Sequence, residues 1–179
     1  MDELIDIVNL EGQPTGNACL KSFAHQNGIL HASVHIWLYT KDQKILVQKR
    51  KNTKETFPGL WDISVAGHIG TGETTLQAAV REIAEEIGCI MPTNHLNYLR
   101  IWEDKHYLSN GITDHEIHHI YVGELTLSLE QLTPQQEEVA AIKFIDINEL
   151  SSDCNNPQLF VPHPREYYQY IINTLKERF

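Results

Sequence analysis

Hydrophobic and polar residues alternate along residues 30–40 (LHASVHIWLYT) and 44–50 (KILVQKR), and the polar tripeptide KDQ lies between them. Alternation with a period of two around a short polar break predicts a β-hairpin. The residues that follow, 51–60, predict a loop. Other stretches with a strand-like pattern are residues 3–9, which precede a turn at EGQPTG, and 61–66, 96–103, 116–126 and 139–145.

A helical pattern is clearest from about Thr74 to Ile87, where apolar residues recur every three or four positions and Gly88 follows as a C-terminal stop. A short helix is predicted at 147–151, and a longer one at 164–178 begins with a proline. Strands joined by hairpins, with few helices between them, are typical of an α/β protein whose mixed sheet carries helices on its faces.

The composition narrows the class of protein. The chain has 179 residues, of which 41% are hydrophobic and 21% charged, so we expect one globular domain spanning 1–179. The net charge of −10 disfavours binding to nucleic acid or to an anionic membrane. No apolar run is long enough to span a bilayer, and the acidic start MDELIDIVNL does not resemble a signal peptide. The three cysteines, Cys19, Cys89 and Cys154, are scattered along the chain, which favours reduced thiols over a disulfide framework. Since reduced thiols are typical of the cytosol, we expect a cytoplasmic protein.

Three glutamates, Glu82, Glu85 and Glu86, lie within an arc of roughly 100° on the predicted 74–87 helix. An acidic helix face is usually just solvated. Like charges at these spacings cost stability, however, unless a cation lies among them, and the helix has no lysine. Mg²⁺ and Mn²⁺ prefer such clusters of carboxylate oxygens, completed by water and substrate phosphates. The helix therefore carries a candidate metal site.

The stretch from Gly67 to Cys89 resembles the Nudix box, G-x5-E-x7-R-E-U-x-E-E-x-G-U, in which U is a bulky aliphatic residue, and only Cys89 departs from it. The resemblance implies the Nudix fold, an α/β/α sandwich around a mixed β-sheet, and Mg²⁺- or Mn²⁺-dependent hydrolysis of a nucleoside diphosphate linked to another group. We expect an N-terminal extension at 1–28, a core at 29–162 that contains the box at 67–89, and a C-terminal helix at 163–179, in a monomer or homodimer.

The box also implies roles for individual residues. Those implied to bind metal are Gly67 through its carbonyl, Glu82, Glu85 and Glu86, with Glu85 and Glu86 also catalytic. Glu73 and Arg81 are implied to form a structural pair that orients the loop and the helix. The general base varies across the family, and the candidates here are Glu86, Glu116, Glu137 and Glu138, among which the sequence does not decide.

A second resemblance extends beyond the box. The segments 21–35, 45–61, 64–68 (SVAGH) and 114–116 (DHE) are similar to isopentenyl-diphosphate isomerase, a Nudix-fold enzyme that binds one divalent metal with three histidines and two carboxylates. The matching positions are His25, His31, His68, Asp114, which replaces a glutamate, and Glu116; His25 lies one residue closer to His31 than in the isomerase. Basic residues implied to bind a diphosphate are Lys21, Arg50 and Lys54.

The resemblance to the isomerase breaks at Ala66, where that enzyme has a cysteine that exchanges a proton with the allylic carbon. Alanine has no titratable proton and cannot do this. The isomerase also has a degraded box, whereas the helix glutamates are intact here. Taken singly, a histidine such as His35 or His118 is more often a packed or surface residue than a ligand. The matching positions gain weight because they fit one framework together.

Three functional hypotheses remain. The first is a metal-dependent Nudix pyrophosphohydrolase that cleaves a diphosphate linkage in a small, nucleotide-type substrate. The second is an isopentenyl-diphosphate isomerase-like enzyme, which Ala66 disfavours, and the third is a non-catalytic diphosphate sensor, which the intact glutamates disfavour. Aromatic residues able to stack a base or cover a prenyl chain, although most are expected in the core, are Trp37, Tyr39, Trp61, Tyr98, Trp102 and Tyr107.

Overall fold

A nine-stranded sheet organises the protein in the computed structural model, which describes residues 2–179. Its strands are β1 (Leu4–Val8), β2 (Pro14–Leu20), β3 (His31–Tyr39), β4 (Lys44–Arg50), β5 (Trp61–Asp62), β6 (Val65–His68), β7 (Leu96–Tyr107), β8 (Thr113–Glu124) and β9 (Val139–Asp146). The helices are α1 (Lys21–Asn27), α2 (Thr75–Ile87), α3 (Ile147–Asp153) and α4 (Arg165–Lys176), with 3₁₀ turns η1 (Thr93–His95) and η2 (Leu129–Gln131).

Strand β3 lies at the centre of this sheet. It pairs antiparallel with β1, β4 and β6, and parallel with β8 along its whole length, from His31 opposite Glu116 to Tyr39 opposite Glu124. Only Tyr39 in this strand is not buried. A strand buried on both faces is expected where helices cover a mixed sheet. The sheet is therefore mixed, as predicted.

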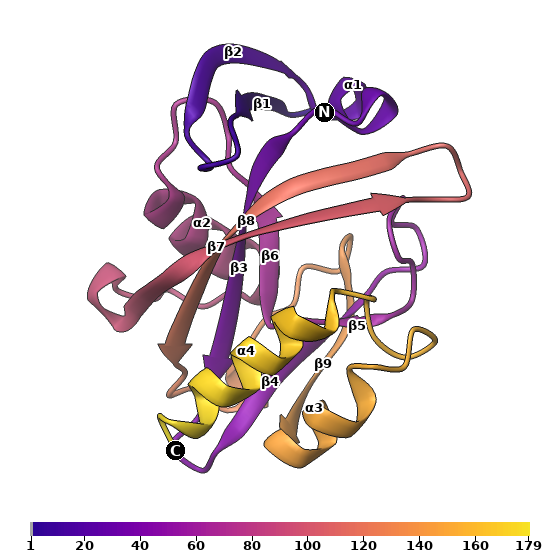
Figure 1. Ribbon diagram of the computed structural model, residues 1–179. Coiled ribbons are helices and arrows are strands. Elements are labelled where there is room, and N and C mark those ends of the chain that lie inside the picture. The colour runs from indigo at the N-terminus through magenta and orange to yellow at the C-terminus, as the bar shows by residue number, and fades with distance from the viewer. Residues whose placement is uncertain (1) are drawn as a thin grey trace.

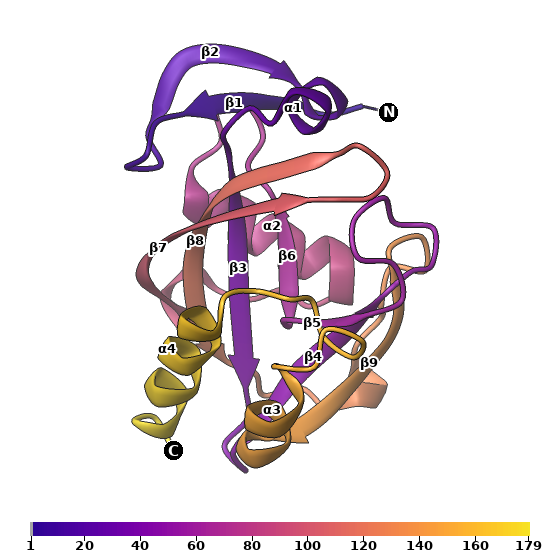
Figure 2. The same cartoon turned by 45° about the vertical axis from the view of Figure 1, so that its right-hand side comes forward.

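The two faces of β3 pack against different helices. Val34 and Ile36 point to a core shared with α2, whereas Trp37 points to a second core shared with α4, because successive side chains alternate between faces. Figures 1 and 2 show α2 and α4 on opposite sides of the central strands. The predicted α/β/α sandwich is confirmed.

Helix α2 is closed at both ends. Thr74 forms a capping box with Gln77, and Gly88 ends the helix in the left-handed conformation, at φ 68°. A side chain at Gly88 would also press against Thr133, whose Cβ would lie 2.9 Å from the new carbon. The predicted 74–87 helix is confirmed to within one residue, so its glutamates are held in a fixed register.

Two parts of the fold differ from the sequence-based expectation. The β7–β8 hairpin continues through Tyr107 and Thr113, past the predicted bounds 96–103 and 116–126. Its added residues lack apolar alternation because their inward face meets a polar cavity, not a core. Strand β2 and helix α1 were also not predicted, since β2 buries no residue and α1 buries only Ala24 and His25.

Helix α4 confirms the predicted C-terminal helix and begins after Pro164, which occupies its N-cap position. Its residues Tyr167, Tyr168 and Ile171 complete the second core. Within residues 2–179, no helix combines the length and the hydrophobicity needed to cross a membrane.

The contribution of the Thr74 cap to the stability of helix α2 can be measured. We expect Thr74→Ala to lower the free energy of unfolding by ~1 kcal/mol, because the side chain satisfies an otherwise unpaired backbone N–H of the first turn. Urea denaturation of both proteins measures the difference. Thr71→Ala, at a nearby exposed threonine, is the matched control and should change it little; equal effects of the two variants would contradict the assigned cap.

Candidate active site and metal ligands

A cavity of about 600 Å³ opens over the end of β3 that lies away from the α4 core. Ser33 and His35 on β3 and Glu116 and His118 on β8 line it, on the same sheet face as Trp37. One face of these strands is thus polar at one end and apolar at the other. The remaining wall comes from the 50–57 loop, from β6 and α2, from β7, and from the segment before α4.

The helix glutamates meet this cavity at the edge formed by β6. Glu82 and Glu85 line it, and Gly67 allows the close approach of Glu82, because a Cβ at Gly67 would collide with the Glu82 carboxylate. Glu86 lies buried behind this wall, where its Oε2 accepts hydrogen bonds from Gln48 Nε2 at 3.0 Å and from the Ala66 N–H at 3.2 Å. Glu82 thus packs against Gly67 and Glu86 against Ala66, so these α2 carboxylates lie along β6.

Burial shapes the charge of these glutamates. It raises the pKa of Glu86 to about 8, and the nearby Glu82 carboxylate adds to this increase. Burial also raises the pKa of Glu82 to about 7, although the Arg81 guanidinium opposes the shift. A divalent cation bound among these oxygens would stabilise the charged form of Glu86 and so lower its pKa.

Arg81 supplies positive charge to the glutamates of α2 as well as to Glu73. Its guanidinium contacts Glu73 at 2.9 and 2.8 Å, Glu82 at 2.7 Å and Glu85 at 3.0 Å, and donates to the His68 carbonyl at 3.0 Å. The predicted pairing of Glu73 with Arg81 is present. Repulsion between Glu82 and Glu85 thus needs no metal to offset it, and a metal is favoured by the buried Glu86 carboxylate and by the position of Glu82 and Glu85 on the cavity wall.

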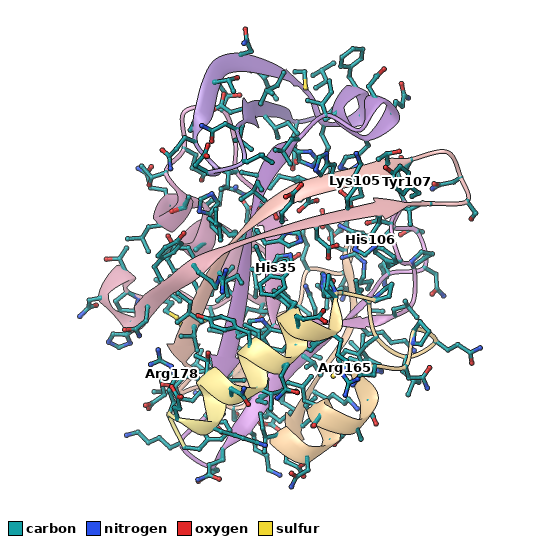
Figure 3. The ribbon with its side chains drawn as sticks, viewed as in Figure 1. His35, Lys105, His106, Tyr107, Arg165 and Arg178 are labelled. Atoms are coloured by element: carbon teal, nitrogen blue, oxygen red, sulfur yellow. The ribbon has the colours of Figure 1, made fainter. Side chains whose placement is uncertain are left out.

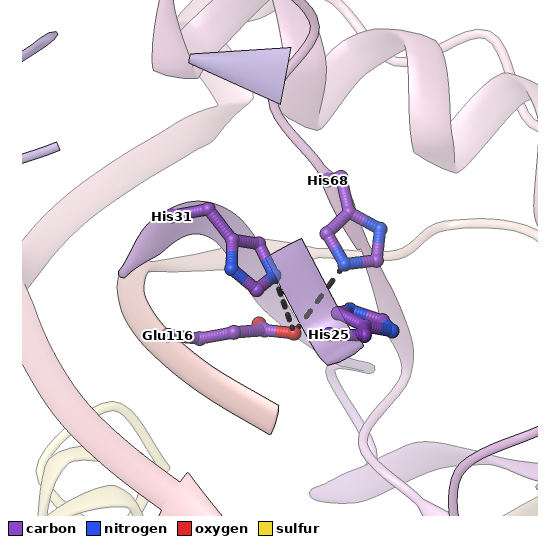
Figure 4. A group of neighbouring side chains, drawn as sticks. All are labelled: His25, His31, His68 and Glu116. Carbon is purple, nitrogen blue, oxygen red and sulfur yellow. Dashed lines mark ion pairs between the residues drawn. The ribbon is translucent and has the colours of Figure 1, made fainter. Parts of the chain in front are cut away.

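Three histidines form a second group of candidate ligands at the N-terminal end of β3, shown with Glu116 in Figure 4. The rings of His25, His31 and His68 lie with their centroids 5.2–5.6 Å apart. Glu116 Oε1 is 3.6 Å from His31 Nε2 and 3.4 Å from His68 Nε2. Asp114 Oδ1 lies 3.8 Å from His25 Nε2. The five positions matched to the isomerase are therefore brought together.

Unpartnered atoms test whether this group fits a metal ion. Nε2 of each of the three histidines and Oδ1 of Asp114 are buried without a hydrogen-bond partner among the described residues. His31 Nδ1 is 2.9 Å from the Ile29 carbonyl, an arrangement that leaves Nε2 free to bind a metal. Burial lowers the pKa of His25 to about 4 and raises that of Asp114 to about 9, with Glu116 adding to the latter. The fit is good, because orphaned buried nitrogens require such a partner.

The predicted diphosphate-binding residues line the same cavity. Arg50 is held by Asp62, 3.1 Å from its Nη1, and by the side chain and carbonyl of Thr56. Lys54 Nζ lies 2.6 Å from Glu138 Oε2, and Lys21 Nζ lies 3.6 Å from Glu3. These contacts fix the Arg50 and Lys54 positive charges at the rim of the cavity.

The structure also separates the candidate bases. Glu137 is exposed and does not line the cavity, whereas Glu138 lines it but is paired with Lys54. Burial alone would raise the pKa of Glu138, but Lys54 lowers it. Glu116 is enclosed by imidazoles, including His118 Nδ1 at 3.2 Å. Its pKa falls well below its usual range, because hydrogen bonds from the imidazoles outweigh burial.

Sequence reasoning missed the inner end of the cavity. There the polar side chains come from several strands and from the segment before α4, namely His35, Asp62, Asp104, His106, His118 and His163. Figure 3 labels two of them, His35 and His106. The available signal was the spacing of two between Glu116 and His118 and between Asp104 and His106, which places each pair on one strand face. None of the aromatic residues considered from the sequence lines the cavity within residues 2–179.

Comparisons with known proteins agree with this geometry. A family model described as the NUDIX domain matches residues 29–171. Nudix hydrolase 3 of Arabidopsis thaliana is 32% identical over 83% of this chain, which spans only 20% of that protein. Isopentenyl-diphosphate Delta-isomerase of Pectobacterium atrosepticum is 32% identical over 81% of this chain and 77% of the enzyme. The NUDIX domain of Shewanella oneidensis NrtR, crystallised with ADP ribose, matches 82% of this chain and 86% of its own, with a TM-score of 0.59 at 20% identity.

The raised pKa of Glu86 predicts how stability depends on pH in the metal-free protein. Between pH 4.5 and about 8 the folded state retains a proton that the unfolded state has lost, so this group makes the protein less stable as pH rises. In the presence of a chelator, Glu86→Gln should therefore gain melting temperature relative to the natural protein as pH increases from 5 to 9. Glu85→Gln, at a half-exposed position on the same helix, is the control; a Glu86→Gln difference that does not change with pH would contradict the assignment.

Proposed function

The chain belongs to the Nudix family, and on this premise we propose that it is a metal-dependent hydrolase that cleaves the diphosphate linkage of a small, nucleotide-type substrate. One observation carries the proposal: Glu82 and Glu85 line the same cavity as Arg50 and Lys54. Carboxylates suit divalent cations, and fixed basic groups suit the phosphates that those cations also bind. The relatives named as Nudix hydrolase and as isopentenyl-diphosphate isomerase both support a diphosphate compound as the ligand.

We propose Mg²⁺ or Mn²⁺ as the cofactor at the helix site, held by Glu82, Glu85, Glu86 and the Gly67 carbonyl. When bound, such ions offset the phosphate charge in the transition state and lower the pKa of a water molecule. The chain's own contribution is to position these groups. Arg81 orients Glu82 and Glu85, while Gln48 and the Ala66 N–H hold one oxygen of Glu86.

Glu86 is our choice for the group that accepts the proton from the attacking water. Glu137 is an exposed residue, Glu138 is paired with Lys54, and Glu116 is enclosed by imidazoles, whereas Glu86 lies directly behind the cavity wall beside Ala66. Among the described residues, no hydrogen bond engages Oε1 of Glu86, so this oxygen is free to accept a proton. Arg50 and Lys54 would hold the phosphates in line for attack on phosphorus.

The isomerase alternative retains one specific point in its favour, the assembled group of His25, His31, His68, Asp114 and Glu116. We propose that this group binds a divalent metal in the present protein too, since its unpartnered nitrogens match that use. One acid–base group that isomerisation needs is missing, because Ala66 has no titratable proton. Among the described residues, the apolar side chains that line the cavity are Phe57, Ala66 and Val161, which provide little surface for a prenyl chain.

Turnover should depend on the helix carboxylates. We expect a screen of nucleotides, dinucleotides, sugar nucleotides and prenyl diphosphates with Mg²⁺ or Mn²⁺ to identify a substrate by its release of phosphate or nucleoside monophosphate. On that substrate, Glu85→Gln and Glu86→Gln should each lower kcat by ~100-fold or more, because each removes charge that stabilises the transition state. Glu137→Gln is the matched control. Near-natural turnover in both helix variants, with the fold intact, would disprove the assigned active site.

Isomerisation should be negligible in the natural protein. Conversion of isopentenyl to dimethylallyl diphosphate needs one proton added and another removed, and general acid–base help of this kind is worth ~10²–10⁴ in rate. Incubation with isopentenyl diphosphate in deuterated water, followed by mass spectrometry, measures the product. Deuterated dimethylallyl diphosphate formed at the rate of a true isomerase would favour the alternative function. Ala66→Cys restores the missing thiol, and weak activity in that variant alone would fit our assignment.

A further inference from the structure

A second group of imidazoles surrounds Asp104 at the inner end of the cavity. Asp104 Oδ2 lies 3.0 Å from His106 Nε2, 3.1 Å from His163 Nδ1 and 4.0 Å from His118 Nε2. These side chains come from β7, β8 and the segment before α4, so residues far apart in the sequence converge on one carboxylate oxygen. They are separate from the histidines matched to the isomerase, and the proposed hydrolysis does not use them.

One nitrogen of each of these imidazoles lacks a hydrogen-bond partner, whereas His163 Nδ1 is hydrogen-bonded to Asp104 Oδ2 at 3.1 Å. Nε2 of His106, of His118 and of His163 is buried and unbonded within residues 2–179. His106 Nε2 has no aligned bond although Asp104 is near. The side chains of Asp104, His118 and His163 are only 6% exposed, so water cannot readily satisfy these atoms. The first histidine group likewise has unbonded Nε2 atoms near one carboxylate, and here the Nε2 atoms of His106 and His118 face Asp104.

The surrounding residues hold the His118 ring in place. His118 Nδ1 lies 2.8 Å from Ser33 Oγ and 3.2 Å from Glu116 Oε2, and its ring stacks on His35 at a centroid distance of 3.7 Å. A histidine that binds metal through one nitrogen almost always donates the N–H of the other to such a partner. The arrangement therefore directs Nε2 of His118 toward Asp104 and keeps its lone pair available.

A similar support exists for His163. While Nδ1 faces Asp104, Nε2 lies 3.5 Å from Asp62 Oδ1, and Asp62 is itself held by Arg50 at 3.1 Å. A carboxylate on the far side of a ligating imidazole is the usual outer-shell arrangement of a metal centre. Both imidazoles are thus oriented from behind, which a simple surface ion pair would not require.

We propose that Asp104, His118 and His163, with His106 as a further ligand, bind a divalent transition-metal ion at a second nitrogen-rich site in the cavity. Imidazole nitrogens with one carboxylate suit Zn²⁺, Co²⁺ or Mn²⁺, whereas Mg²⁺ prefers an all-oxygen shell. The ion would contact the unbonded Nε2 atoms of His106 and His118, and it would take the place of the hydrogen bond between His163 Nδ1 and Asp104. The competing arrangement is a metal-free ion pair in which a protonated His163 faces Asp104 and Asp62.

Glu116 connects this site with the first histidine group. Its Oε1 faces His31 and His68, and its Oε2 faces His118. A metal on either side would polarise the same carboxylate, so the affinity of one site should depend on occupancy of the other. The cavity would then contain two imidazole sites linked by Glu116, which is a ligand of the first and supports His118 in the second, next to the carboxylates of α2.

Metal binding measured without turnover tests this proposal. The full chain is stripped with a chelator, and Co²⁺ is then added in the presence of millimolar Mg²⁺, which occupies oxygen-only sites. Equilibrium dialysis gives the stoichiometry, and the visible absorption of bound Co²⁺ reports on its nitrogen ligands. We expect two Co²⁺ sites. His163→Gln should weaken one of them by more than the ~10–100-fold typical of an outer-shell change, and His25→Gln should leave that same site in place.

His25→Gln is the matched control because it removes one ligand from the first group only. Melting temperatures measured in chelator show whether each variant folds. If His163→Gln does not fold, His106→Gln replaces it, since that side chain is 19% exposed and lies on the β7–β8 hairpin. A Co²⁺ stoichiometry unchanged by these inner variants, or abolished entirely by His25→Gln, would overturn the proposal and leave the ion-pair arrangement. Because no substrate is involved, either result is independent of whether the protein is a hydrolase.

Discussion

The parallel pairing of β3 with β8 is the constraint on which the rest of the site depends. It sets His31 beside Glu116 and Ser33 beside His118, so that alternate residues of both strands share one sheet face. Further along this face, Trp37 and Val122 are opposite each other in the core covered by α4. At the boundary α4 supplies a polar partner, because Tyr167 Oη lies 2.8 Å from His35 Nδ1 and accepts from Trp37 Nε1 at 3.0 Å. The polar residues nearer the start of β3 line the cavity instead, next to the point where α4 begins.

Strand β6 joins the two halves of the chemistry. His68 belongs to the first histidine group, Gly67 admits the Glu82 carboxylate, and the Ala66 N–H holds Glu86. A strand exposes successive residues on opposite faces, so a short segment can serve the imidazoles on one side and α2 on the other. Because Gly67 has no side chain, the Glu82 carboxylate reaches the cavity. Because Ala66 has no thiol, the proton exchange that isomerisation needs is missing.

The sequence predicted the parts of the fold whose side chains follow a regular period. Helix α2 and the β3–β4 hairpin show apolar periodicity, and the spacing from Gly67 to Gly88 indicated the site on α2. The outer half of the β7–β8 hairpin was missed because its inward residues are polar and line a cavity. Apolar and polar residues therefore do not alternate there. Asp104, His118 and His163 were missed as a group because their proximity depends on tertiary pairing. Arg81 was assigned to Glu73 alone, although its reach to Glu82 and Glu85 follows from their helical spacing.

We propose that water in this cavity attacks phosphorus. Hydrolysis of the substrate found by screening, carried out in water enriched in oxygen-18, identifies the bond that breaks when the products are analysed by mass spectrometry. We expect one heavy oxygen atom in a phosphate group of one product and none in the organic part, because water attacks phosphorus and the diphosphate bond breaks. Heavy oxygen bound to carbon, or a converted product that contains none, would contradict it.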